Sequence, residues 1–195
     1  MNDIIRNIKT ELTKHLDEPR MEHTLGVMYT AASLAMRYDY DIEKAMIAGL
    51  LHDCAKCIPG QEKINLCIKH GLSISEIEYK NPGLLHAKLG AAFAKSIYHI
   101  NNDEILNAIA SHTTGRPDMT LLDKIIYISD YMEPGRRNLP NMKDIRRMAF
   151  ENIDNCLYKL LFDSLVYLKT MNMPIDPMTE QTFHYYKKSL KKEAF

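Results

Sequence analysis

The sequence has no excess of charge of either sign, because Lys and Arg together number 25 and so do Asp and Glu. This balance gives no global attraction to nucleic acid or to a membrane surface, although it leaves room for a local basic patch. No apolar run approaches the length of a membrane span, and residues 1–16 are amphipathic rather than signal-like. Four cysteines in 195 residues do not suggest a secreted disulfide framework. We therefore expect a cytoplasmic protein with neither DNA, RNA nor a membrane as a partner.

Strand patterns are almost absent as well. No alternating Val, Ile and Thr run lies between hairpin turns, and no repeat or low-complexity segment occurs. Apolar residues instead recur at helical spacing along most of the chain. Predicted helix boundaries include Asp41 as the cap of a helix that runs through His52 to Pro59, Ser73 with Glu76 as a capping box, and Thr120 as a further cap. The sequence predicts an all-α protein, folded as one compact domain over residues 1–195.

Two common nucleotide-binding motifs are missing, because neither GxxxxGK[ST] nor GxGxxG occurs. A P-loop or Rossmann site is therefore not supported. Cys54 and Cys57 form a C-x-x-C, which could bind zinc or act as a redox pair. No second Cys or His pair lies at zinc-finger spacing, so we expect these two residues to be small buried thiols.

Polar residues on predicted core faces are the informative feature. Four histidines and two aspartates lie on apolar stripes of five predicted helices: His23, His52, Asp53, His86, His112 and Asp130. A single such histidine is usually a hydrogen-bonded core residue. Two buried carboxylates would each cost several kcal/mol without compensation, and a divalent cation supplies it. Mixed imidazole and carboxylate donors suit iron, manganese, cobalt or zinc better than calcium.

The order of these residues resembles a known family. His23, then His52-Asp53, then Asp130 is similar to the H…HD…D signature of the HD-domain metal-dependent phosphohydrolases. The longer matches "EHTLGV", "GLLHDCAK", "LLHAKLGAAFA", "AIASHTTGRPDMTLLDKIIYISDYMEPGRR" and "PIDPMTEQTF" extend the resemblance over nearly the whole chain. The branch that it resembles is the bacterial HD-type symmetrical bis(5′-nucleosyl)-tetraphosphatases. The resemblance implies a single all-helical HD domain with a core at about 18–135, on which helices of residues 141–195 pack.

The same resemblance implies the chemistry of the site. That family uses a di-iron centre and hydrolyses diadenosine tetraphosphate to two ADP. His23, His52, Asp53 and Asp130 would be the metal ligands, and His86 and His112 would hold a second metal or face the phosphates. Two divalent cations can hold a bridging water and lower its pKa for attack on phosphorus, with Asp53 as the natural bridging carboxylate. Many relatives carry a His where this chain has Asp176.

Further residues are expected to contact the substrate, a dinucleoside polyphosphate or a nucleoside diphosphate. Lys56, three residues after Asp53, could neutralise phosphate charge or could simply be a solvated lysine. Arg136 follows Asp130 in a glycine-containing loop, "EPGRR", and an arginine fork binds phosphate bidentately. We assign the catalytic roles to Asp53, Lys56, His86 and Arg136. The predicted nucleotide-binding residues are His23, His86, His112, Thr113, Asp130, Arg136, Asp176, Pro177, Met178, Thr179, Glu180 and Gln181.

Other functions stay open on the sequence alone. An HD-type 5′-nucleotidase or phosphodiesterase would use the same residue types, and a non-catalytic nucleotide-binding regulatory module could keep the same fold. An inactive relative would be free to lose metal ligands, whereas every expected ligand type is present here. The sequence is also compatible with a homodimer.

Overall fold

The computed structural model describes residues 3–136 and 141–193, and side chains as far as residue 189. These residues form helices and no strand, so the all-α prediction is confirmed for them. The helices, in chain order, are α1 (Asp3–Leu12), α2 (Glu18–Arg37), α3 (Ile42–Leu51), α4 (Gly60–Lys69), α5 (Glu76–Lys80), the 3-10 helix η1 (Pro82–Leu85), α6 (His86–Ser96), α7 (Asp103–Ser111), α8 (Leu121–Met132), α9 (Met142–Glu151), α10 (Ile153–Thr170) and α11 (Pro177–Glu193).

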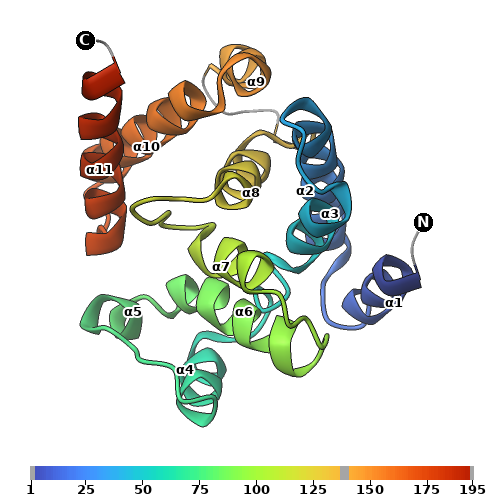
Figure 1. Ribbon diagram of the computed structural model, residues 1–195. Helices are drawn as coiled ribbons and strands as arrows, with labels where there is room; N and C mark the ends of the chain where they lie inside the picture. The colour runs from blue at the N-terminus through green and yellow to red at the C-terminus, as the bar shows by residue number, and fades with distance from the viewer. Residues whose placement is uncertain (1–2, 137–140, 194–195) are drawn as a thin grey trace.

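Helix α8 lies at the centre of the molecule. It packs against the α2–α3 pair on one side and against α7 and α10 on others, while α6 packs on α7 and α11 on α10 (Figure 1). One continuous hydrophobic core runs from Ile5 in α1 to Tyr186 in α11. A small second cluster, which includes Ile64 and Leu85, lies under α4 and η1. Segments far apart in the sequence therefore meet around α8.

Helix starts follow the expected side-chain signals. Asp17 caps α2 by accepting from the Arg20 amide, and Asp41 caps α3. Thr120 and Asp123 form a reciprocal capping box at the start of α8. The caps predicted at Asp41 and Thr120 are thus confirmed.

Other predicted boundaries are wrong. The capping box is formed by Ser75 with Glu78, not by Ser73 with Glu76, since only the former pair exchanges both hydrogen bonds in the described structure. Helix α3 ends at Leu51 instead of running on to Pro59, and residues 52–57 form turns. Periodicity could not reveal this early end, because the burial of Leu51 in the helix continues through His52 and Asp53 in the turn that leads into the site.

The stretch "FHYYKKSLKK" near the C-terminus is typical of a solvated helix, and Cys54 and Cys57 were expected to be buried thiols. Both predictions are wrong in part. Phe183 and Tyr186 of α11 are buried, Phe183 stacks on Tyr158 of α10, and the Tyr186 hydroxyl accepts from the Met119 amide. Helix α11 is therefore amphipathic and packed. Cys54 is buried, whereas Cys57, at the end of the same turn after α3, is exposed.

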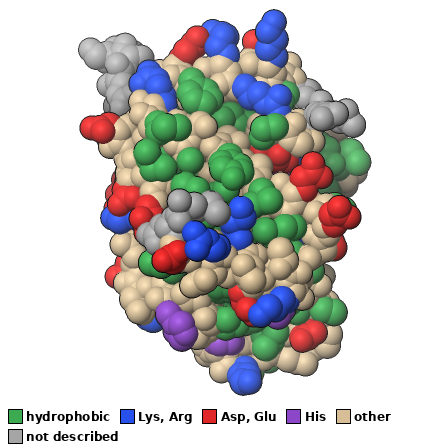
Figure 2. Space-filling model, turned by 90° about the vertical axis from the view of Figure 1, so that its right-hand side faces the viewer, with side chains coloured by type: hydrophobic (Ala, Val, Ile, Leu, Met, Phe, Trp, Pro, Cys, Tyr) green, Lys and Arg blue, Asp and Glu red, His purple; other side chains and the backbone are tan. Residues whose placement is uncertain are grey.

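The surface is mixed in character. On the side that lies to the right in Figure 1, hydrophobic side chains gather in the upper half among basic and acidic ones (Figure 2). The described part of the chain contains no helix that is both long and apolar enough to cross a membrane.

Close packing of α3 against α2 depends on Gly49. A Cβ atom at this position would lie 2.9 Å from the Cα of Met28, which is backbone that cannot move aside. We expect Gly49→Ala to lower the free energy of unfolding by about 1–3 kcal/mol, as overpacked cores do. Urea denaturation measures this change. Gly90→Ala is the matched control, because its Cβ would meet nothing closer than 3.4 Å. Equal stabilities of the two variants would contradict this prediction.

Candidate metal centre

Four histidines from four helices point into one space beside α8. Three of them lie at helix ends: His52 follows α3, His86 begins α6 and His112 follows α7. In each of these three, Nδ1 contacts the backbone carbonyl oxygen three residues earlier, that of Gly49, Gly83 or Ile109. A carbonyl oxygen only accepts, so Nδ1 carries the proton and Nε2 keeps its lone pair. His23, from within α2, contributes the fourth ring.

Asp53 lies between two groups of these rings. Its Oδ1 is 3.2 Å from Nε2 of His86 and 3.5 Å from Nε2 of His112. Its Oδ2 is 3.5 Å from Nε2 of His52 and 3.9 Å from Nε2 of His23. The carboxylate thus faces His86 and His112 with one oxygen and His52 and His23 with the other.

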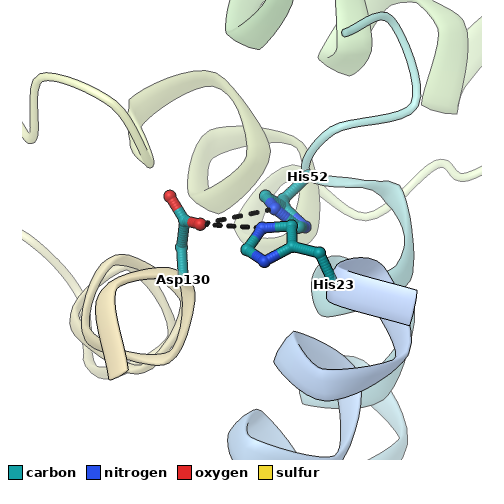
Figure 3. Close-up of side chains that lie close together, drawn as sticks. All are labelled: His23, His52 and Asp130. Atoms are coloured by element: carbon teal, nitrogen blue, oxygen red, sulfur yellow. Dashed lines mark ion pairs between the residues drawn. The ribbon is translucent and has the colours of Figure 1, made fainter. Parts of the chain in front are cut away.

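Asp130 of α8 completes one of the two groups. Its Oδ1 is 3.0 Å from Nε2 of His23 and 3.8 Å from Nε2 of His52, and all three side chains converge (Figure 3). Two sets of ligand-type atoms therefore share this space, His23–His52–Asp130 and His52–Asp53–His112.

The charge states favour cation binding. Burial lowers the pKa of His52 to about 4 and also lowers that of His86, so both rings are neutral at neutral pH. Burial alone would raise the pKa of Asp53 and of Asp130. The surrounding imidazole groups favour the ionised carboxylates and outweigh this effect of burial, so each carboxyl pKa falls below its usual range. Ionised carboxylates beside neutral imidazoles are the protonation states that a divalent metal requires.

Buried polar atoms without hydrogen-bond partners show whether a metal ion would fit the cluster. Among the residues that the structure describes, Nε2 of His23, Nε2 of His52 and Oδ1 of Asp53 are buried and have no hydrogen-bond partner. Buried polar atoms without partners are costly, and here all three are Lewis bases that face one another. A transition-metal cation fits these donors.

Three cationic side chains lie at the more exposed edge of the cluster. Arg20 donates to Oδ2 of Asp53 at 2.8 Å, and Arg136 donates to Oδ1 of Asp130 at 3.1 Å. Lys56 Nζ is 3.1 Å from Nε2 of His86 and 3.7 Å from Oδ1 of Asp53. We call Arg20, Lys56 and Arg136 the cationic rim. Arg137 of the predicted "EPGRR" loop lies outside the described residues.

A pocket of about 400 Å³ adjoins the cluster. Thr113 lines it and also lies 3.3 Å from Nε2 of both His86 and His112. Asp176 and Met178 also line it, and they line as well a second, larger pocket that includes Pro177 and Gln181. The structure therefore brings the start of α11 to the pocket beside the cluster.

Two other residues of the predicted nucleotide stretch face elsewhere. Thr179 is buried, and Glu180 lies 3.7 Å from Lys169 of α10. Neither lines the two pockets.

Sequence reasoning missed two residues. Arg20 lies one helical turn before His23, and Glu133 lies one turn after Asp130, with Oε1 3.1 Å from Nδ1 of His23. This i, i+3 spacing to a predicted ligand is the signal that could have identified both.

The loop after His112 is held by an ion pair of 2.6 Å between Arg116 and the buried Asp123.

Comparison with known proteins defines the class. Residues 20–135 match the sequence pattern of the HD domain family, so the chain belongs to that family. It is 36% identical to the symmetrical bis(5′-nucleosyl)-tetraphosphatase of Bacillus subtilis over 91% of this chain and 92% of that one. It is also 34% identical to the Staphylococcus aureus protein of the same name, over 93% and 94% of the two chains.

A solved structure agrees with this assignment. It is that of a Clostridium acetobutylicum protein described as a predicted HD superfamily hydrolase involved in NAD metabolism. The two structures superpose with a TM-score of 0.91 at 38% identity, over 94% of this chain and 97% of that one. The resemblance to HD-domain phosphohydrolases is thus confirmed.

Proposed function

We propose that this protein is a metal-dependent hydrolase that cleaves diadenosine tetraphosphate symmetrically to two ADP. The observation that carries the proposal is Asp53, whose two carboxylate oxygens face two different groups of ligand atoms. Such an arrangement suits two cations that share one carboxylate. The names of relatives that match more than nine-tenths of this chain support the substrate.

Six residues would hold the metal. His23, His52, Asp130 and Oδ2 of Asp53 surround one position, and His86, His112 and Oδ1 of Asp53 surround the other. Bound divalent cations polarise phosphoryl oxygens and make water a stronger nucleophile at neutral pH. We propose iron for this pair, whereas manganese, cobalt and zinc are the alternatives that the same donors accept.

The cationic rim would bind the phosphates. Arg20 and Arg136 offer planar forks and Lys56 a point charge, at the accessible edge of otherwise buried ligands. Negative charge that builds up on the phosphoryl oxygens during cleavage would be stabilised there. Thr113, which contacts both His86 and His112, can donate its hydroxyl to a phosphate oxygen.

The pocket beside Thr113 would hold one nucleoside. Its wall at Asp176 and Met178 combines an acceptor with an apolar side chain, which suits the polar edge and the flat face of a base. A nucleoside held there, with two phosphates between it and the metal ligands, would place the second phosphorus from the base at the centre. Attack at that phosphorus cuts the tetraphosphate in half.

Product analysis tests this function. Metal-loaded protein is incubated with a panel of diadenosine tetraphosphate, AMP, dAMP and cyclic nucleotides, and the products are separated by chromatography. We expect ADP as the sole product of the tetraphosphate. AMP plus ATP from the tetraphosphate would contradict symmetrical cleavage. Phosphate release from AMP or dAMP, with the tetraphosphate intact, would indicate a nucleotidase, and no turnover with any compound would indicate a binding module.

The cellular setting is also a proposal. All four cysteines are free, which is typical of proteins in a reducing compartment, and we therefore place the protein in the cytoplasm. A homodimer stays a prediction that analytical ultracentrifugation would test.

A further inference from the structure

Glu133 is a buried carboxylate that the chemistry proposed above does not use. It follows the last residue of α8 and is 3% exposed. Its Oε1 accepts from Nδ1 of His23 at 3.1 Å, and its Oε2 accepts from the backbone N–H of Gly135. Each carboxylate oxygen therefore has a specific donor, one from α2 and one from the turn that leads to Arg136.

The surroundings hold this carboxylate in place. A Cβ atom on Gly26 would lie 2.5 Å from Oε2 of Glu133, and one on Gly135 would lie 2.9 Å from both oxygens. These two glycines thus make the space that the carboxylate fills. Arg146 of α9 donates to the carbonyl oxygens of Met132 at 3.0 Å and Glu133 at 2.9 Å, which fixes the backbone.

The other three histidines show what this contact does. His52, His86 and His112 each place Nδ1 on a backbone carbonyl oxygen and direct Nε2 to the cluster. His23 lies within α2, where the carbonyl groups are engaged in the helix, and its Nδ1 partner is a side chain instead. A carboxylate, like a carbonyl, only accepts, so it also keeps the proton on Nδ1 and leaves Nε2 for a metal.

We propose that Glu133 is a positioning residue that fixes the orientation and tautomer of His23 as a metal ligand. The role rests on the metal site of the proposed function. Glu133 anchors the ring on one side, so that Nε2 comes within 3.0 Å of Oδ1 of Asp130. A negatively charged acceptor also makes the imidazole a stronger donor to the metal than a carbonyl acceptor would.

Metal affinity is the first test. Zinc binding to the full chain is measured by competition with a coloured chelator. We expect Glu133→Leu to weaken the binding by about 10- to 100-fold, as the loss of such outer partners does. Asp123→Asn is the matched control, because Asp123 is also buried and charge-paired but contacts Arg116 at the opposite end of α8. We expect this control to lose stability and to keep its zinc affinity.

A spectroscopic signature separates positioning from a general loss of structure. In the zinc-loaded protein, nitrogen NMR of the histidine rings reports which nitrogen carries the proton. We expect His23 to show a slowly exchanging Nδ1–H that Glu133→Leu abolishes, while the corresponding signals of His52, His86 and His112 persist. His23→Ala identifies the resonance.

The outcomes distinguish the two proposals. Unchanged zinc affinity and an unchanged His23 ring signal in Glu133→Leu would overturn the role of Glu133 and leave the proposed function standing. Failure of the unmodified protein to bind zinc or ferrous iron would overturn the metal site itself, and the role of Glu133 with it.

Discussion

Asp53→Asn is expected to lose most of its bound metal and to hydrolyse diadenosine tetraphosphate about a thousand-fold more slowly or worse. The asparagine keeps the shape of the side chain but loses the charge and one of two acceptor oxygens. Asp53 is 2% exposed and faces both groups of ligand atoms, so neither proposed metal position keeps its ligand set. Metal activation is worth several kcal/mol in the transition state, which corresponds to about this factor in rate.

Elemental analysis of freshly purified protein, before and after reconstitution with ferrous iron, measures the loss. About two metal equivalents per chain are expected for the unmodified protein if both positions are filled. Asp144→Asn is a suitable control, since Asp144 lies exposed on α9. Retention of metal and activity by Asp53→Asn would contradict the bridging role. Circular dichroism shows whether the variant remains folded.

The fold was largely predictable because its helices carry strong local signals. Apolar residues at helical spacing and capping residues such as Asp41 and Thr120 lie within a few positions of the ends that they define. The end of α3 was not predictable in this way. His52 and Asp53 continue the buried pattern beyond Leu51, but they do so in a turn. A local pattern reports burial and cannot distinguish a helix from a turn that is equally buried.

The candidate metal centre was predictable in its residue types and not in its geometry. Burying four histidines and two aspartates on core faces costs free energy unless other groups pair with them. This argument needs only the local sequence pattern. Which oxygen of Asp53 faces which ring is set by how α2, α3, α6, α7 and α8 pack, and no spacing contains that information. Arg20 and Glu133 were missed although each lies at i, i+3 spacing from a proposed ligand, since a charged residue at that spacing is ordinary on a solvated helix face.

The packing of the helices also gathers cationic side chains locally in a chain that is neutral overall. The sequence has equal numbers of acidic and basic residues, yet Arg20, Lys56 and Arg136 come together from three separate segments. Each of them lies within 4 Å of a carboxylate oxygen of Asp53 or Asp130. An anionic substrate would therefore meet three cations together at the accessible edge of the cluster, which favours binding of phosphates there.

Arg136→Ala is expected to reduce kcat/KM for diadenosine tetraphosphate by roughly 30- to 1000-fold while metal content stays unchanged. This range corresponds to a loss of about 2–4 kcal/mol of transition-state stabilisation, which is typical when one donor to developing charge is removed. Arg136 donates through Nε to the carbonyl oxygen of Asp130 and through Nη2 to its carboxylate, so its guanidinium lies beside a proposed ligand without replacing one. Lys56→Ala should show a similar pattern with a smaller loss, because an ammonium group lacks the planar fork.

Two comparisons make the Arg136 prediction decisive. Arg136→Lys keeps the charge and loses the fork, so we expect it to recover part of the activity, and the unrecovered part measures bidentate recognition. Arg147→Ala removes an exposed arginine of α9 that pairs with Glu151, and it should leave kcat/KM within about two-fold, since surface ion pairs contribute little. Near-normal turnover by Arg136→Ala would remove this residue from the phosphate site. Loss of metal together with activity would instead place its effect on the proposed ligand Asp130, because the guanidinium and the carboxylate are 3.1 Å apart.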